Sequence, residues 1–240
     1  MNINLNKVTL PTIHTNLKSI YLTDKTMTAR KENFLAKMKQ QSIDTAIIYA
    51  DREHGANFEY FTGFIPRFEE ACLVMHANGD SYLLLGNENL KLAAHSRIPA
   101  QAIHVPYFSL PNQPMNGEKA LADYFKESQI SPDAIIGVIG WKLFTSSQYD
   151  NSGLFDLPFY IVDSLIHYVA DRKQLKNFAS ALISPEGGLR TTHNANEIAH
   201  FEYGATLAGK GMFAAIQAVE VGKTEKEIGA LLAQDGQPNT

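Results

Sequence analysis

Three polar side chains near residue 200 have the spacing of half a metal site. His193, Glu197 and His200 lie four and three residues apart, which places them on one face of a helix. Two imidazole nitrogens and a carboxylate suit zinc or a related divalent ion. The alternative is that Glu197 lies in the positive first turn of a helix and that His200 is solvated. Since the sequence holds no second group of residues with the spacing of metal ligands, we expect no metal site in this chain.

A second polar cluster, Asp51-Arg52-Glu53-His54, follows an apolar run that predicts a buried strand. Proteins of the α/β class place functional loops directly after such strands. The alternative is a surface turn with local ion pairs. Tyr60 and Arg67, a few residues further on, are candidates for the mouth of a pocket. We therefore expect His54, Tyr60 and Arg67 to control substrate access or to form an interface. Trp141 is interpreted as a core residue.

Two other motifs carry little chemistry. Gly222-Lys223-Thr224 is similar to the end of a phosphate-binding loop, but Gln217 stands where that loop needs a glycine. Ser152 and Ser184 lack the Gly-x-Ser-x-Gly context of a hydrolase nucleophile. We expect neither nucleotide binding nor serine hydrolysis.

Charge and cysteine content restrict the partners and the compartment. The 240-residue chain has a net charge of −4, so it offers no global positive field to nucleic acid or to an anionic membrane, and we expect neither partner. Cys72 is the single cysteine and cannot form an internal disulfide, which favours a cytoplasmic location. The first residues lack the pattern of an export signal, and no apolar run approaches the ~18 residues of a membrane span.

Hydrophobic periodicity predicts the elements that position these residues. The predicted helices are 26–42, 89–98 and 117–130, and the predicted strands are 45–50, 71–76, 81–86, 101–108, 133–140 and 158–164. Asn78-Gly79 favours a tight turn, so 71–76 and 81–86 are expected to pair as an antiparallel hairpin. Helices interleaved with strands and one hairpin predict an α/β domain with a mixed sheet flanked by helices.

The pattern changes to helix alone near residue 190. Pro, Gly, Asn and Thr concentrate in "ALISPEGGLRTTHNAN", a composition typical of a boundary. We predict an N-terminal domain over 1–171, a linker over 172–192 and a further segment over 193–240.

The last segment is predicted to form two amphipathic helices. Thr224 and Glu227 form a capping box at the start of the second helix. An apolar stripe runs along the first helix, and its members are Ile198, Phe201, Ala205, Ala208, Met212, Ile216 and Val219. Such a stripe needs a packing partner, so we expect the residues after about 190 to self-associate or to be poorly ordered.

Two stretches together resemble a known family. "NFEYFTGF", followed by the predicted hairpin, resembles the N-x-x-Y-L-T-G-F segment of the creatinase/prolidase-type N-terminal domain. The stretch that begins "RTTHNANEI" resembles the opening of the catalytic domain in the same peptidase family (M24), which reads R-x-x-K-S-x-x-E-I and later G-x-T-E-x-E-I. The matching residues are Arg190, Glu197, Ile198, Gly222, Thr224, Glu225, Glu227 and Ile228. His193 replaces the usual lysine, and Asn194-Ala195 replaces the usual Ser-Pro.

The resemblance implies a creatinase-type α/β N-terminal domain followed by the helical start of a pita-bread (α+β) domain. Xaa-Pro aminopeptidases and prolidases of this family hold two divalent ions, manganese, cobalt or zinc, on two Asp, one His and two Glu, whereas creatinase uses the fold without metals. The resemblance places those ligands beyond Thr240. We therefore expect no catalytic residue, metal ligand or cofactor in this chain, and two metal ions only in a longer protein.

The resulting hypothesis is the N-terminal part of a Xaa-Pro aminopeptidase or prolidase-like metallopeptidase, inactive as the 240-residue chain. It implies a homo-oligomer, and a proline-containing peptide as substrate only of the full-length protein. Two alternatives remain open: a non-catalytic binding or oligomerisation module of the same fold, and a fragment of a creatinase-like amidinohydrolase.

Overall fold

A computed structural model describes residues 9, 18–113, 115 and 117–233. The chain divides into two compact units. One unit is Asp24–Thr192, and the other combines Met1–Thr23 with His193–Thr240.

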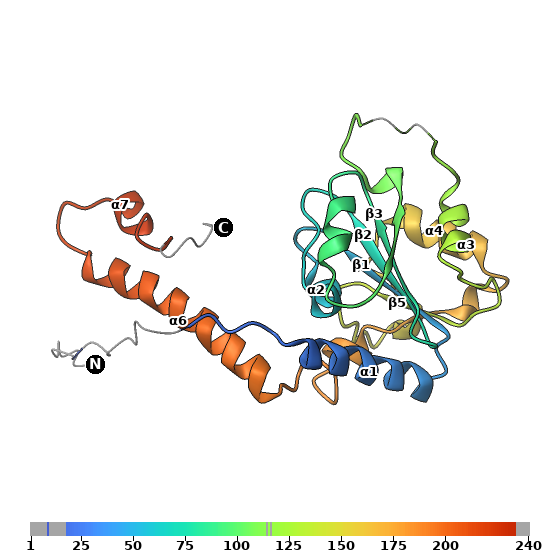
Figure 1. The fold of residues 1–240 in the computed structure, drawn as a ribbon, viewed down its shortest axis with the longest axis horizontal. Coiled ribbons are helices and arrows are strands. Elements are labelled where there is room, and N and C mark those ends of the chain that lie inside the picture. Colours follow the sequence, from blue (N-terminus) through green and yellow to red (C-terminus); the bar gives the residue numbers. More distant parts are fainter. Residues whose placement is uncertain (1–8, 10–17, 114, 116, 234–240) are drawn as a thin grey trace. The chain divides into compact units, whose positions relative to one another are not determined.

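The first unit is built on a six-stranded sheet with the strand order β4-β3-β2-β1-β5-β6 (Figure 1). The strands are β1 (Thr45–Ala50), β2 (Ala71–His76), β3 (Ser81–Leu85), β4 (Gln101–His104), β5 (Ile136–Ile139) and β6 (Leu175–Asn177). β2 runs antiparallel to both of its neighbours, and the other pairs of described strands are parallel. The predicted α/β class with a mixed sheet is confirmed.

The predicted hairpin is also confirmed. β2 and β3 pair antiparallel, with Ala71 opposite Leu85 and Met75 opposite Ser81. Gly79 adopts φ 95°, a left-handed conformation that a side chain rarely takes, and its N–H donates to His76 O at 2.8 Å. The Asn78-Gly79 pair therefore sets the register of the two strands.

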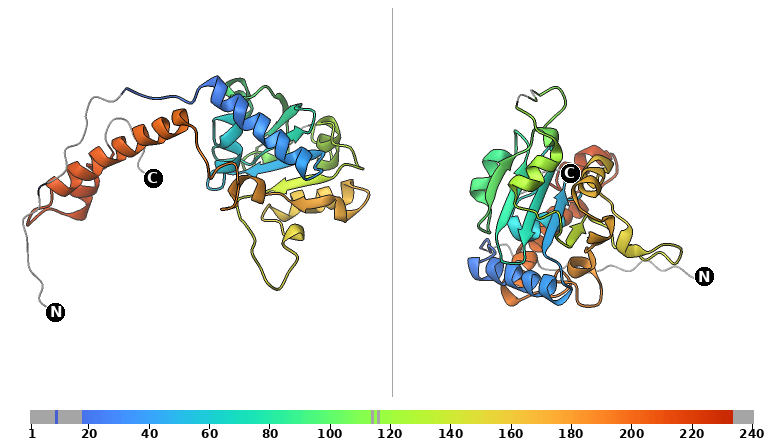
Figure 2. Two further views of the ribbon diagram at one scale, coloured as in Figure 1. Left: turned by 90° about the horizontal axis from the view of Figure 1, so that it is seen from below. Right: turned by 90° about the vertical axis from the view of Figure 1, so that its right-hand side faces the viewer.

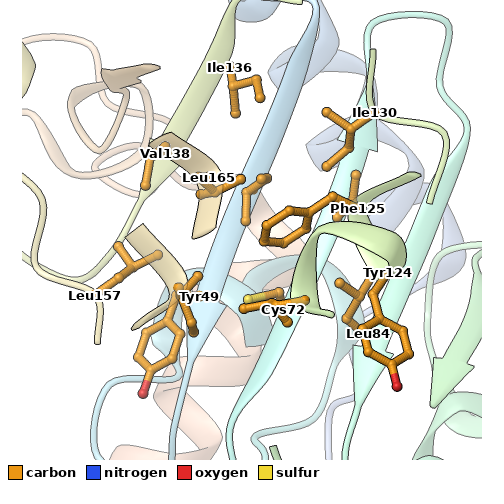
Figure 3. Packing of buried hydrophobic residues seen from close by; sticks show 14 of the residues in the cluster. Tyr49, Cys72, Leu84, Tyr124, Phe125, Ile130, Ile136, Val138, Leu157 and Leu165 are labelled. Atoms are coloured by element: carbon orange, nitrogen blue, oxygen red, sulfur yellow. The ribbon is translucent and has the colours of Figure 1, made fainter. Parts of the chain in front are cut away.

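Helices cover both faces of the sheet (Figure 2). On one face, α1 (Asp24–Gln40), α2 (Ala56–Thr62) and α5 (Ser180–Ile183) bury large side chains against the even-numbered residues of β1. On the other face, α3 (Leu121–Glu127) and α4 (Phe159–Tyr168) pack against the odd-numbered residues of β1, which include Tyr49. Figure 3 shows the core on this second face, where Phe125 of α3 and Leu165 of α4 lie with Cys72 of β2. The result is a three-layer α/β/α unit.

The prediction of a strand over 158–164 is wrong, because these residues form the start of α4. Ile161 and Leu165, one helical turn apart, are both completely buried. A short apolar run of this kind is compatible with a strand or with a buried helix, and only the face that it buries distinguishes the two.

Four other predicted elements are shorter or different in the structure. The helix predicted over 117–130 is α3 (Leu121–Glu127), and the strand predicted over 133–140 is β5 (Ile136–Ile139). Residues 89–98 form a 3₁₀ helix, η1 (Leu90–His95), rather than an α-helix. The strand predicted over 101–108 ends as β4 at His104, because Pro106 begins a second 3₁₀ turn, η2 (Pro106–Phe108). The remaining short helices are η3 (Asn151–Gly153) and η4 (Arg172–Gln174).

The range 172–192, predicted as a linker, contains regular structure. It holds η4, the edge strand β6 and α5, and the first compact unit extends to Thr192. β6 has only three residues, of which Leu175 alone is buried. A strand so short shows no alternation in the sequence, which explains why it was not predicted.

The second unit contains two capped helices, α6 (Ala195–Gln217) and α7 (Glu225–Gly229). Thr224 and Glu227 exchange the hydrogen bonds of a capping box, as predicted. Asn194 and Glu197 form a second capping box at the start of α6. None of the helices in the described part of the chain has the length and hydropathy that crossing a bilayer requires.

Candidate functional site

Polar and aromatic side chains gather where β1 and β5 end and β2 begins. Because β1 and β5 are parallel and β2 is antiparallel to β1, these three points lie on the same edge of the sheet. Loops at the carboxyl ends of strands are the usual position of binding sites in open α/β sheets. The edge site comprises Asp51 and His54 after β1, Glu70 before β2, Trp141 after β5, and Tyr160 from α4.

The Asp51–His54 segment forms a tight turn around one carboxylate oxygen. Asp51 Oδ1 accepts the backbone N–H groups of Glu53 and His54, each at 2.8 Å, and lies 3.0 Å from His54 Nδ1. Burial acts to raise the pKa of Asp51, but the hydrogen bonds from His54 and Glu53 outweigh it and hold the pKa below its ordinary value. The turn therefore has the local polar contacts of the surface-turn alternative, and it also orients the imidazole of His54.

Glu70 links this turn to two tyrosines. Tyr49 Oη lies 3.2 Å from Asp51 Oδ2 and 3.2 Å from Glu70 Oε1, although its single proton serves one carboxylate at a time. Tyr160 donates a short hydrogen bond to Glu70 Oε2. Burial and the negative charge of Glu70 raise the pKa of both phenols far above the ordinary value. Both tyrosines therefore stay protonated and act as hydrogen-bond donors.

Cys72 lies in the core beneath this network and has no nucleophilic character. The residue is 1% exposed, and burial, together with the charge of Glu70, raises the pKa of its thiol. The site thus offers hydrogen-bond donors, carboxylate acceptors and an imidazole, but no activated nucleophile. Its chemistry suits binding and positioning.

Trp141 belongs to the site and not to the core, so the core prediction is wrong. Its side chain is 42% exposed, and its ring stacks on His54 with centroids 4.3 Å apart and planes 24° apart. Lys142 Nζ lies 4.5 Å from the centre of the same ring, a cation–π distance. The backbone N–H groups of Trp141 and Lys142 donate to Asp156 Oδ2 at 2.6 and 2.7 Å. Asp156 therefore fixes the loop that presents the indole.

Arg67 lies in the loop before β2, beside an exposed aromatic ring. Its guanidinium carbon is 4.8 Å from the centre of Phe68, and that of Arg52 is 6.0 Å away. Phe68 is 54% exposed and adopts φ 69°, a conformation unusual for a bulky residue. The backbone N–H of Arg67 donates to Asn89 Oδ1 at 3.0 Å, which anchors the loop. Arg67 thus lies on a basic and aromatic surface that Arg52 of the Asp51–His54 turn shares.

Tyr60 lies elsewhere, in the core face that α1 and α2 cover. The side chain is 9% exposed, Tyr60 Oη donates to Leu189 O at 3.2 Å, and the guanidinium of Arg30 lies 4.2 Å from its ring centre. Of the three predicted access or interface residues, the structure places His54 and Arg67 at exposed loops and Tyr60 inside the unit.

A hydrogen-bond network, with Asn57 buried and Arg190 partly buried, joins the two motifs that carry the family resemblance. Asn57, 2% exposed in α2, donates from Nδ2 to Gly140 O at 2.7 Å, and its Oδ1 accepts from Arg190 Nη1 at 2.7 Å. Burial lowers the pKa of Arg190. We call Asn57, Gly140 and Arg190 the Asn57 relay. It connects the end of β5 with the last residues of the first unit. Asn57 and Arg190 belong to the two stretches that carry the resemblance, but Gly140 and the contact among the three residues were not predicted.

The residues of the candidate metal half-site, which was not expected to bind metal, have other contacts in the structure. Glu197 Oε2 accepts the backbone N–H of Asn194 at 2.8 Å, and His200 Nδ1 lies 2.5 Å from Ile20 O. The ring of His193 packs edge-on against Phe201. Within the described residues no group of three or more His, Cys, Asp or Glu side chains is arranged to hold a metal ion. These residues do not fit the two-metal centre that the resemblance implies for a longer protein.

Comparison with known proteins shows the family. Residues 30–150 match the model of the Creatinase/Prolidase N-terminal domain, and the chain belongs to this family. None of the curated proteins matches the chain.

Several solved structures share the fold. The prolidase from Pyrococcus horikoshii OT3 has 18% identity and a TM-score of 0.55, over 85% of this chain and 47% of its own. The Xaa-Pro dipeptidase from Bacillus anthracis has 11% identity and a TM-score of 0.54, over 86% of this chain and 47% of its own. Dipeptidase PepE from Mycobacterium ulcerans has 15% identity and a TM-score of 0.55, over 88% of this chain and 49% of its own. The chain therefore spans about half the length of the structures that it resembles.

The charge of the Asp51 carboxylate should make the free energy of unfolding depend on pH. Its pKa in the folded state lies below the ordinary value of 3.8, so its ionised form stabilises the fold above that pH, and the stabilisation is lost as the pH falls through the folded pKa. Asp51→Asn keeps an oxygen for the two backbone N–H groups but removes the charge. We expect the wild type to exceed the variant in unfolding free energy by more at roughly pH 6 than at roughly pH 3.

Chemical denaturation followed by the fluorescence of Trp141, the single tryptophan, measures this difference. Glu53→Gln, an exposed neighbour in the same turn, is the control and should leave the pH dependence unchanged. A difference between wild type and Asp51→Asn that stays constant with pH would contradict the assignment.

The structure leaves no room for a side chain at Gly140, which lies at the edge site. A Cβ atom on Gly140 would lie 2.1 Å from Asp156 Oδ1 and 2.4 Å from its Cγ, and the carboxylate cannot move away without losing the N–H groups of Trp141 and Lys142. Gly140→Ala should lower the unfolding free energy by about 1–3 kcal/mol and shift the emission of Trp141. Gly153→Ala, where a Cβ meets nothing within 4 Å, is the matched control. Equal stability of the two variants would be evidence against the Asp156 contact.

Proposed function

We propose that this chain is the non-catalytic N-terminal domain of a Xaa-Pro aminopeptidase or prolidase-like metallopeptidase. The observation that carries the proposal is the match of residues 30–150 to the Creatinase/Prolidase N-terminal domain. Support of a coarser kind comes from the fold, which is similar to that of a prolidase over 85% of this chain. In this proposal, residues 193–240 are the helical start of a pita-bread domain.

The edge site supports a role in access or contact. Arg52, Arg67, Phe68 and Trp141 present charged and aromatic groups to solvent, and such groups are enriched where proteins meet partners. Both tyrosines of the site are hydrogen-bond donors and its thiol is buried, which supports a role in positioning a proline-containing peptide rather than in cleaving it. His54 and Arg67 are the residues that we assign to this contact.

Cleavage is assigned to the longer protein. Two divalent ions, manganese, cobalt or zinc, would belong to its catalytic part, because the described residues offer no ligand group for them. A cytoplasmic location is part of the proposal and is supported by the single, buried Cys72.

The test compares the 240-residue chain with the product of its entire encoding locus, both purified and supplied with manganese. We expect the locus to continue in frame beyond Thr240 and its product to hydrolyse a dipeptide with a C-terminal proline. Hydrolysis of creatine in place of the dipeptide would favour the amidinohydrolase alternative. A locus that ends at Thr240 would refute the peptidase proposal.

One observation favours the second candidate function, a module for binding or assembly. The apolar side chains Ile198, Phe201, Met212 and Ile216 of α6 are each more than half exposed. Exposed apolar side chains gathered on one helix are typical of a surface that packs against a partner.

A further inference from the structure

Phe68 exposes a bulky side chain from a strained backbone. The side chain is 54% exposed, and the residue adopts φ 69°, in the left-handed region that bulky residues avoid. The strain costs free energy, and a ring that stays half in water gains little burial to offset it. Strained residues of this kind are concentrated at binding sites, so Phe68 is a candidate for contact with a ligand.

Buried polar groups fix the chain on both sides of Phe68. Glu69 is 4% exposed, and its carboxylate accepts the backbone N–H groups of Glu88 and Asn89, each at 3.0 Å. The backbone N–H of Arg67 donates to the side chain of Asn89, which is 1% exposed. Residues 67 and 69 are thus anchored in the unit, and the residue between them is held with its ring partly in solvent.

Two guanidinium groups lie beside this ring. The guanidinium carbons of Arg67 and Arg52 are 4.8 and 6.0 Å from the ring centre of Phe68. Both arginines are exposed, and among the described residues no carboxylate forms an ion pair with either of them. The carboxylates of Asp51 and Glu70 accept hydrogen bonds from other groups. The positive charge beside Phe68 is therefore open to an anion from solution.

The chemistry of these three side chains selects the ligand. The planar guanidinium group of arginine matches a carboxylate with two parallel hydrogen bonds. The exposed ring of Phe68 offers an apolar face beside that charge. Because both guanidinium carbons lie within 6.0 Å of the ring centre, a single residue packed on the ring is within reach of both arginines. A residue with a free carboxylate and a compact apolar ring, such as a C-terminal proline, uses all three groups.

We propose that Arg52, Arg67 and Phe68 form a clamp that binds the C-terminal proline residue of a peptide. The carboxylate of the peptide binds the guanidinium groups, and its pyrrolidine ring packs on the ring of Phe68. Glu69 is a positioning residue, because it holds the backbone of the clamp without contact to the ligand. The inference rests on the proposed function for the choice of a proline-containing peptide, and it names the group of that peptide which this chain recognises.

Titration of the 240-residue chain followed by NMR of the arginine side-chain Nε–H groups tests the clamp. The ligands are glycyl-proline, with a free carboxylate, and glycyl-prolinamide, without one. We expect glycyl-proline to shift the signals of Arg52 and Arg67 and to bind about tenfold more tightly than the amide. Arg67→Gln should remove this preference, whereas Arg172→Gln, an exposed arginine elsewhere, is the matched control and should keep it. Equal affinities of the wild type for the two ligands, or no shift at either arginine, would overturn the proposal.

Phe68→Gly separates a binding role of the ring from a structural one. Glycine adopts φ 69° without strain, so the variant should unfold at a higher denaturant concentration than the wild type. The same variant should bind glycyl-proline several-fold more weakly, because the apolar face is lost. A variant that binds glycyl-proline as tightly as the wild type does would contradict the role of Phe68. Acetate that binds as tightly as glycyl-proline would also contradict it, since acetate has no ring to pack.

Failure of the clamp and failure of the proposed function give different results. A chain that binds glycyl-proline through Arg67, although its locus ends at Thr240, would support the clamp and refute the peptidase proposal. A product of the longer locus that hydrolyses the dipeptide with a KM unchanged by Arg67→Gln would support the peptidase proposal and refute the clamp.

Discussion

Asn57→Leu is expected to lower the unfolding free energy of the first unit by about 2–4 kcal/mol. Leucine has a similar shape but makes no hydrogen bond, so Gly140 O loses a donor at 2.7 Å and Arg190 loses an acceptor at 2.7 Å. A buried polar group without a partner costs about 1–3 kcal/mol, and more when it is charged. Both groups are affected by one substitution, which makes the expected effect large for a side chain of this size.

The measurement is chemical denaturation followed by Trp141 fluorescence, which reports the first unit alone because Trp141 is the single tryptophan. Asn33→Leu, on the exposed side of α1, is the matched control and should change stability by less than about 0.5 kcal/mol. Limited proteolysis after Arg190 should become faster in Asn57→Leu, since the relay ties this arginine to α2 and β5. Equal stabilities of the two variants would show that the relay contributes nothing to the fold.

Phe34→Ala is expected to cost about 3–5 kcal/mol, the range for truncation of a fully buried phenylalanine. Phe34 of α1 is 0% exposed, and its ring centre lies 4.9 Å from that of Phe61 and 5.7 Å from that of Phe178. These three rings join α1, α2 and the segment that follows β6. The loss therefore opens a cavity at the point where three parts of the chain meet.

The free energies of unfolding of Phe34→Ala and Phe159→Ala are compared by chemical denaturation. Both variants lose the same side chain, but Phe159 is 78% exposed, so the difference between them measures the effect of burial. We expect the second variant to stay within about 0.5 kcal/mol of the wild type. A loss of stability in Phe34→Ala no larger than that would mean that α1 does not pack on the sheet as the structure shows.

The sheet was predictable where local signals were strong. The run 45–50 is apolar and β-branched, and Asn78-Gly79 separates two apolar runs, so β1 and the β2–β3 hairpin followed from the sequence. α4 did not, because a short apolar run is compatible with a strand or with a helix until the face that it buries is known. β6 is too short to carry a pattern, and only its pairing with β5 makes it a strand.

The edge site was predictable only in part. The position of His54 after a buried strand indicated a functional loop. Loops that follow parallel strands lie at the same edge of the sheet, where α/β proteins place their binding sites. Glu70, Trp141 and Tyr160 come from separate parts of the chain, and no spacing in the sequence links them to Asp51. Tyr60 lies close in sequence to Arg67, but the helix α2 turns its side chain toward Arg30 and Leu189.

Hydrolysis by the 240-residue chain tests the central claim that this chain is a non-catalytic domain. The purified chain is supplied with manganese, cobalt or zinc and assayed on a dipeptide with a C-terminal proline, and the metal bound per chain is measured after dialysis. Our account predicts hydrolysis no faster than the protein-free control and no stoichiometric metal. Hydrolysis above the control that is lost in Glu197→Gln, accompanied by stoichiometric metal, would contradict it.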